Sequence, residues 1–218
     1  MPKLRRGSAA MPPGSLVAGF LAAGPIVGRL PYPMMPPGAQ RVVRAALRHV
    51  WAGLDARAEQ RLSSATEPEI TTILQSALNQ LLDDESEPVP GFSSSYFETV
   101  ERGAEMVSYD GKHIEKRPDL RFRLQGRIPA VHDRTHYGLF AECKLLDTLP
   151  SLSLYASKGI LRFVKGEYAW AMPHGMMVGY LRAGELTRAD LVHFLNRRKT
   201  EYNVVIAAEA GENEEELV

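Results

Sequence analysis

The chain has 218 residues, of which 44% are apolar and 24% are charged, and its formal net charge is zero. These values fit one globular domain with a sizeable core and exclude a strongly acidic or strongly basic protein. The single cysteine, Cys143, excludes an internal disulfide and a cysteine-rich zinc site, and it favours a cytoplasmic location. Acidic charge is concentrated in residues 207–218, so the remainder is mildly positive, which permits a nucleic-acid partner.

Residues 1–38 are rich in proline, glycine and alanine and predict a flexible arm ahead of the domain. A basic start and the apolar run 15–28 resemble a secretory signal, although Pro25 interrupts the run. Three interpretations stay open: a flexible leader, a downstream translation start at Met34 or Met35, and a cleaved signal on a secreted protein. The run is too short to cross a bilayer, so no membrane partner is expected.

Two helices are expected after the arm. Residues 39–63 place apolar side chains at a helical period with arginines on the other face, where solvation is the default and phosphate contact the alternative. Residues 67–82 form a second amphipathic helix, with Thr66 as its N-cap and Glu69 completing a capping box.

Strand patterns follow an acidic loop. Residues 96–102 alternate loosely between apolar and polar side chains, and residues 120–124 alternate cleanly. The run 137–146 is apolar enough for a central strand, yet it contains Glu142 and Lys144.

The last part of the chain alternates again between helix and strand. Residues 152–164 predict a helix, 176–181 a short buried strand, and 187–199 a closing helix capped by Thr187. The order of elements predicts one α/β domain over residues 39–206, with a mixed sheet flanked by helices and a disordered acidic tail over 207–218.

Three charged residues stand out in this pattern. Asp119 begins a strand after Pro118, and Glu142 and Lys144 occupy alternate positions of the later strand, so their side chains share one face of the sheet. Charged groups in an apolar strand cost several kcal/mol unless they are paired or bind a metal. A structural ion pair on a solvated edge strand is the alternative, but the apolar flanks favour a central strand. If the two strands are neighbours, Asp119 joins the pair.

The segments RPDLRFRL and LFAECKLL resemble the bipartite signature of the PD-(D/E)XK nuclease superfamily, which includes restriction endonucleases and repair nucleases. The resemblance covers roughly residues 66–182. It implies a restriction-endonuclease-like mixed sheet flanked by helices, here with an extra N-terminal helix, and metal-dependent hydrolysis of phosphodiester bonds. A glutamate of the first helix is often part of the site in this family. Glu69 matches it best, its capping role is the alternative, and Glu67 is the second choice.

The resemblance also implies a role for each site residue. Asp119 and Glu142 are the expected ligands of Mg²⁺, or of Mn²⁺ in its place, because these cations prefer oxygen ligands. The Cys143 carbonyl is the expected third ligand, and Glu69 is expected to bind the metal directly or through water. Lys144 is expected to position the attacking water and to offset negative charge in the transition state, with a pKa that a neighbouring metal could depress.

The segments SLYASKGILRFVKGEYAW and GMMVGY resemble the helix and next strand of restriction-like proteins associated with phage defence. Lys158 and Arg162 are four residues apart and share a helix face, where they either touch a substrate phosphate or face solvent. His132, Asp133 and His136 form a weaker hint of a metal site that lacks a fourth ligand.

The expected function is therefore Mg²⁺-dependent hydrolysis of nucleic acid, with DNA favoured over RNA, in restriction or phage defence. We expect a homo-oligomer or a subunit of a larger complex, because the domain is small and only mildly basic. The main alternative is a non-catalytic nucleic-acid-binding or scaffold subunit with a nuclease-like fold. A secreted, toxin-like nuclease is the second alternative.

Overall fold

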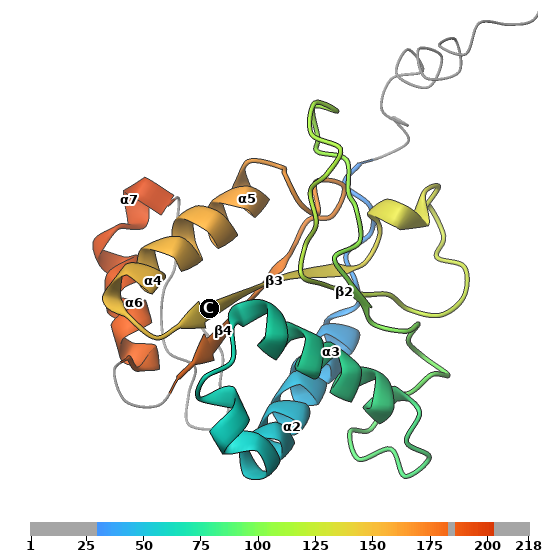
Figure 1. Ribbon diagram of the computed structural model, residues 1–218. Helices are drawn as coiled ribbons and strands as arrows, with labels where there is room; N and C mark the ends of the chain where they lie inside the picture. Colours follow the sequence, from blue (N-terminus) through green and yellow to red (C-terminus); the bar gives the residue numbers. More distant parts are fainter. Residues whose placement is uncertain (1–29, 183–185, 203–218) are drawn as a thin grey trace, which may run out of the picture.

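A mixed sheet of four strands forms the centre of the computed structural model, which describes residues 30–182 and 186–202, apart from the side chains of residues 55–61 (Figure 1). The strands are β1 (Glu101–Arg102), β2 (Leu120–Phe122), β3 (Leu139–Leu146) and β4 (Met176–Leu181), in the order β1-β2-β3-β4. Pairing is antiparallel from β1 to β3, and β4 runs parallel to β3. Helices flank the sheet, so the α/β class and the mixed sheet predicted from the sequence are confirmed.

Helices α2 (Pro37–Leu62) and α3 (Glu67–Leu82) cover one face of the sheet, close to the predicted bounds (Figure 1). Proline suits the first position of α2 because that position needs no backbone N–H donor. The predicted capping box at the start of α3 is confirmed, since the Glu69 carboxylate accepts from the backbone N–H of Thr66 at 2.7 Å.

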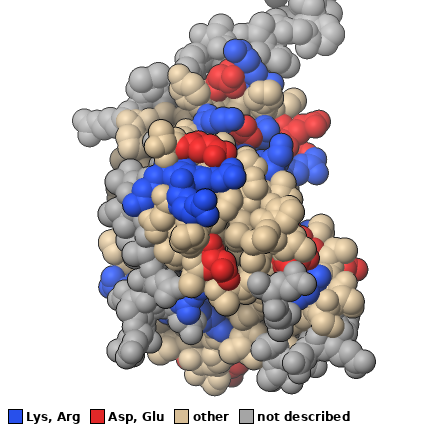
Figure 2. Space-filling model, turned by 90° about the vertical axis from the view of Figure 1, so that its left-hand side faces the viewer, with Lys and Arg blue, Asp and Glu red and all other residues tan. Residues whose placement is uncertain are grey.

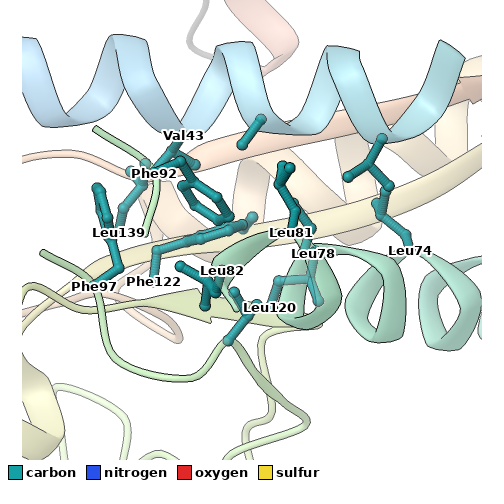
Figure 3. Packing of buried hydrophobic residues seen from close by; sticks show 14 of the residues in the cluster. Val43, Leu74, Leu78, Leu81, Leu82, Phe92, Phe97, Leu120, Phe122 and Leu139 are labelled. Atoms are coloured by element: carbon teal, nitrogen blue, oxygen red, sulfur yellow. The ribbon is translucent and has the colours of Figure 1, made fainter. Parts of the chain in front are cut away.

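The main core lies between these two helices and the sheet. Most of its buried side chains come from α2, α3, β2, β3 and the loop that follows α3, and the ten labelled in Figure 3 are Val43, Leu74, Leu78, Leu81, Leu82, Phe92, Phe97, Leu120, Phe122 and Leu139. On β3 this core takes the odd-numbered residues Leu139, Ala141 and Cys143. Because side chains alternate along a strand, Glu142 and Lys144 belong to the opposite face.

A continuous helical segment covers that opposite face. It consists of α4 (Leu149–Tyr155), a π-helical turn η2 (Ala156–Ile160) and α5 (Leu161–Val164). The helix starts three residues before the predicted Leu152, because Thr148 caps it and Pro150 fits its first turn. The sequence did not predict the π-helical turn.

Two further helices pack beside this segment: α6 (Arg188–Arg197), capped by Thr187 as predicted, and α7 (Lys199–Tyr202). A 3-10 turn, η1 (Arg134–His136), precedes β3. No helix within 30–182 and 186–202 has the length and apolar character needed to cross a bilayer.

Some strand predictions need correction. The strand predicted over 96–102 is reduced to β1 and a bridge between Phe97 and Leu124, because antiparallel pairing with β2 is short. The strand β4 is not buried as predicted: it ends the order of the sheet, and of its side chains only Tyr180 is buried.

The chain packs on the domain from Leu30 onward, within the arm predicted over 1–38. Tyr32 and Met35 are buried, and the backbone N–H of Tyr32 donates to the carbonyl of Ala171 at 2.7 Å. Residues 1–29, with the signal-like run, and residues 203–218, with the acidic tail, lie outside the described residues.

Candidate active site

Asp119 and Glu142 come together through the register of β2 and β3. Leu120 pairs with Ala141, so Asp119 lies opposite Glu142 one step beyond the last paired residues. The Asp119 carboxylate accepts from the backbone N–H of Cys143 at 2.8 Å. Asp119 therefore satisfies a β3 donor at the point where the regular pairing of β2 ends.

Lys144 lies at the centre of the resulting cluster. Its Nζ is 2.9 Å from Glu142 Oε1, 3.0 Å from Glu67 Oε1 and 3.9 Å from Asp119 Oδ2. It also donates to the carbonyl of Cys143, at 2.6 Å. The ammonium thus binds three carboxylates and the carbonyl oxygen that was expected to be a metal ligand.

The glutamate that α3 contributes is Glu67, and the choice of Glu69 is corrected. Glu67 Oε2 accepts from the backbone N–H of Leu145 at 2.8 Å, while Oε1 pairs with Lys144. The Glu69 carboxylate is exposed and accepts hydrogen bonds from the backbone N–H and the hydroxyl of Thr66. Residues two apart on a helix point in nearly opposite directions, so both glutamates cannot face β3.

Glu142 is the most buried member of the cluster, with 2% of its side chain exposed. Its Oε1 accepts from Lys144 and from Nη1 of Arg162, which lies 3.1 Å away. Its Oε2 is buried and has no hydrogen-bond partner among the described residues. Burial, with the nearby charge of Asp119, raises the pKa of Glu142 to about 7, against the opposing effect of Lys144 and Arg162.

The pKa values of the neighbouring groups follow from burial and charge. Burial raises the pKa of Asp119, although the N–H of Cys143 and the charge of Lys144 oppose it. Burial alone would lower the pKa of Lys144, but Glu142 and Glu67 outweigh that effect and raise it. Without a metal, Lys144 is therefore a charged ammonium at neutral pH, whereas a metal was expected to depress its pKa.

Arg162 enters the site from α5. Besides Glu142, its Nη1 contacts the hydroxyl of Tyr168, and its guanidinium carbon lies 5.5 Å from the centre of the Tyr168 ring. Lys158, predicted to share a helix face with Arg162, is exposed, and the π-helical turn η2 contains it. Such a turn changes the i,i+4 phase on which the prediction relied. No pattern in the sequence indicated Tyr168.

Within the part of the chain that the structure describes, no group of three or more His, Cys, Asp or Glu side chains is arranged to hold a metal ion. The hint at His132, Asp133 and His136 is thereby not supported; His136 Nε2 is 3.7 Å from Asp133. In the main cluster the donor chemistry does fit a divalent cation, because the ligands are hard oxygens and Glu142 Oε2 lacks a partner.

The cluster combines three carboxylates, from Glu67, Asp119 and Glu142, with the cations Lys144 and Arg162. Such a site can bind a cation and also offset charge on an anionic substrate. Comparison of the chain with protein-family models, with curated proteins and with solved structures gave no match. The function is therefore inferred from the geometry of the site.

Proposed function

We propose that this protein is a Mg²⁺-dependent phosphodiesterase that hydrolyses nucleic acid, with DNA favoured over RNA. One observation carries the proposal: Asp119, Glu142 and Lys144 meet at one end of the β2–β3 pairing, and a buried carboxylate oxygen there has no partner among the described residues. The order of helix, three antiparallel strands, helix and parallel strand supports a restriction-endonuclease-like fold.

In this proposal Asp119, Glu142 and the Cys143 carbonyl hold the ion, which supplies Lewis-acid polarisation of the phosphodiester when bound. Lys144 orients the attacking water and offsets the charge that develops on the phosphoryl oxygens. Glu67 anchors Lys144 from α3 and fixes it beside β3.

The surface offers support for a polyanionic substrate. Figure 2 shows lysine and arginine side chains, with acidic side chains among them, on the side of the molecule formed by α4 to α7. On α6 and α7 three exposed basic residues contribute to the charge of this part of the protein: Arg188, Arg197 and Lys199. Arg198, between the two helices, is paired with Glu201 at 3.2 Å. We propose that nucleic acid contacts this region, in a homo-oligomer or a larger complex that acts in restriction or phage defence.

One observation favours the alternative, a non-catalytic nucleic-acid-binding subunit. The ammonium of Lys144 bonds to the oxygen atoms that would hold the ion, and no preformed metal-holding group is present among the described residues. The two candidates differ in a measurable way, because only the enzyme cleaves substrate when Mg²⁺ is supplied.

The test is incubation of the protein with plasmid, single-stranded DNA and RNA, in Mg²⁺ or in EDTA. We expect cleavage in Mg²⁺ only, and we expect Asp119→Asn and Lys144→Met to lower its rate by at least about a hundredfold, as removal of a charge-stabilising group does. Asparagine is chosen because its carbonyl oxygen can still accept from the Cys143 N–H, so the strand pairing is preserved.

A matched pair of variants separates the two glutamates of α3. Glu67→Gln is expected to lower the cleavage rate, because it weakens the anchor of Lys144. Glu69→Gln is expected to retain the rate, because the Glu69 carboxylate only caps the helix. Absence of Mg²⁺-dependent cleavage of all three substrates would favour the scaffold, and full activity of Asp119→Asn and Lys144→Met would refute the site.

A further inference from the structure

We propose that Arg162 competes with the divalent cation for Glu142 and, once displaced, contacts a phosphate of the substrate. This inference rests on the proposed function and deepens it. Arg162 then has two positions. It binds the Glu142 carboxylate when the divalent cation is absent, and it binds the nucleic acid when the cation is bound.

The two oxygens of the Glu142 carboxylate have different numbers of partners. Oε1 carries both Lys144, at 2.9 Å, and Arg162, at 3.1 Å, whereas Oε2 is buried without a partner. A buried carboxylate oxygen without a donor is costly, so the carboxylate is only half satisfied by its two protein cations. A cation that Glu142 helped to hold would supply the missing partner and would repel the guanidinium.

The charge of the cluster also favours the release of one protein cation when a divalent ion binds. When all three carboxyls are ionised, they face two protein cations, which leaves one negative charge. A divalent ion would reverse the sign of the cluster if both protein cations stayed. Lys144 has further anchors at Glu67 and the Cys143 carbonyl, whereas Arg162 is bound to this cluster only through Glu142. Arg162 is therefore the cation that leaves at the lower cost.

Arg162 can move without leaving the site. Its side chain is 32% exposed, against 2% for Glu142, so the guanidinium reaches solvent. Tyr168 holds it through a hydrogen bond and the face of its ring, and the Glu167 carboxylate lies 4.0 Å from its Nε. A guanidinium tethered in this way and released from a carboxylate suits a phosphate, which it can bind through two parallel hydrogen bonds.

Competition predicts two opposite effects of Arg162→Met. The variant lacks the competitor, so the free protein should bind Mn²⁺ more tightly, by about fivefold, the lower end of typical coupling between linked ligands. It also lacks the phosphate contact, so the KM for an oligonucleotide substrate should rise by about tenfold, as loss of a charged hydrogen bond does. A residue with a merely structural role would weaken both.

The experiment measures Mn²⁺ affinity of the metal-free protein by electron paramagnetic resonance of the unbound ion, and the KM for cleavage separately. Arg162→Lys keeps a cation and should lie between the wild type and Arg162→Met in both measurements. Lys165→Met is the matched control: it removes one charge from an exposed residue just after α5 and should change neither value appreciably. Circular dichroism verifies that each variant is folded.

The outcomes separate the two proposals. If the wild type binds Mn²⁺ but Arg162→Met binds it equally or less tightly, the competition is refuted while the proposed function stands. If Mn²⁺ affinity rises but KM is unchanged, the phosphate contact is refuted. If the wild type binds no Mn²⁺, the proposed function itself fails, and the competition fails with it.

Discussion

At the scale of single residues, Glu142 differs from the other carboxylates of the site in how deeply it is buried. Asp119 and Glu67 expose 28% and 32% of their side chains, whereas Glu142 exposes 2%. The free energy of ionising Glu142 is therefore dominated by the loss of hydration, and its pKa is raised to about 7. Near neutral pH this carboxyl is divided between its protonated and ionised forms.

This pKa predicts how stability depends on pH. The folded protein binds the Glu142 proton more tightly than the unfolded chain, whose carboxyl has a pKa near 4.5. The resulting stabilisation is fully present below the unfolded value and is lost as pH rises through the folded value. Between pH 5 and 8 it amounts to about 2 kcal/mol of the free energy of unfolding. We expect Glu142→Gln to remove this component.

Urea denaturation of the wild type and of Glu142→Gln at several pH values from 5 to 8 measures the effect. The difference between the two free energies of unfolding should shift in favour of the variant as pH rises. Parallel pH profiles for the two proteins would show that Glu142 titrates near its ordinary pKa in the folded state.

At the scale of elements, the start of β3 fixes the register that sets Asp119 opposite Glu142. Gly138 has a φ of +148°, and a Cβ placed there would lie 2.7 Å from the backbone carbonyl oxygen of Phe122 on β2. A backbone atom cannot give way as a flexible side chain can. The glycine therefore permits a close approach of the two strands at the end of their pairing that lies opposite the site.

Gly138→Ala is expected to lower the free energy of unfolding by about 2 kcal/mol, because the methyl group forces β2 and β3 apart. Cleavage should fall as well, since Asp119 depends on that pairing. Gly53→Ala in α2 is the matched control: its Cβ meets nothing within 4 Å, so helix propensity should stabilise it by up to about 1 kcal/mol. Equal effects of the two substitutions would contradict this account.

Local patterns explain which elements could be predicted. The capped helix α3 has strong apolar periodicity and the strand β3 is a long apolar run, so the bounds of both follow closely from neighbouring residues. The π-helical turn η2 differs from an α-helix by one residue in phase, which apolar periodicity does not resolve. The burial of β4 depends on its place at the end of the sheet, which is a property of the whole fold.

In the site, too, some features follow from neighbouring residues and others depend on how distant elements pack. Glu142 and Lys144 share a strand face, and this followed from their spacing alone. The choice between Glu67 and Glu69 required the rotation of α3 against β3, and the sequence gives both residues a helix-start position. The contact between Arg162 and Glu142 joins an irregular helix to a strand, so residue spacing could not reveal it.

At the scale of the whole molecule, a net charge of zero conceals an uneven surface. Lysines and arginines, with acidic side chains among them, lie on the side of the molecule formed by α4 to α7 (Figure 2). Arg197 and Lys199 are exposed there. Arg117, by contrast, is paired with Glu105. The proposed contacts with phosphate depend on exposed residues such as Arg197 and Lys199.

The double variant Arg197→Gln/Lys199→Gln is therefore expected to weaken nucleic-acid binding. Each lost phosphate contact should lower the slope of log affinity against log salt by about 1. Fluorescence anisotropy with a labelled oligonucleotide in EDTA, over a range of salt concentrations, measures this slope. Lys112→Gln/Arg117→Gln removes the same charge from residues paired with Asp110 and Glu105 and should change the slope less. Equal slopes for both double variants would argue against a specific role for α6 and α7.

Glu67 connects the helical layer of α3 to β3 by holding both the Leu145 amide and the Lys144 ammonium. The packing of α3 against β3 and the position of the Lys144 side chain therefore depend on the same residue, Glu67. A fluctuation that lifts the first turn of α3 would abolish the proposed catalysis while most hydrogen bonds of the protein remained intact. A ligand or substitution that shifts α3 would therefore also displace Lys144.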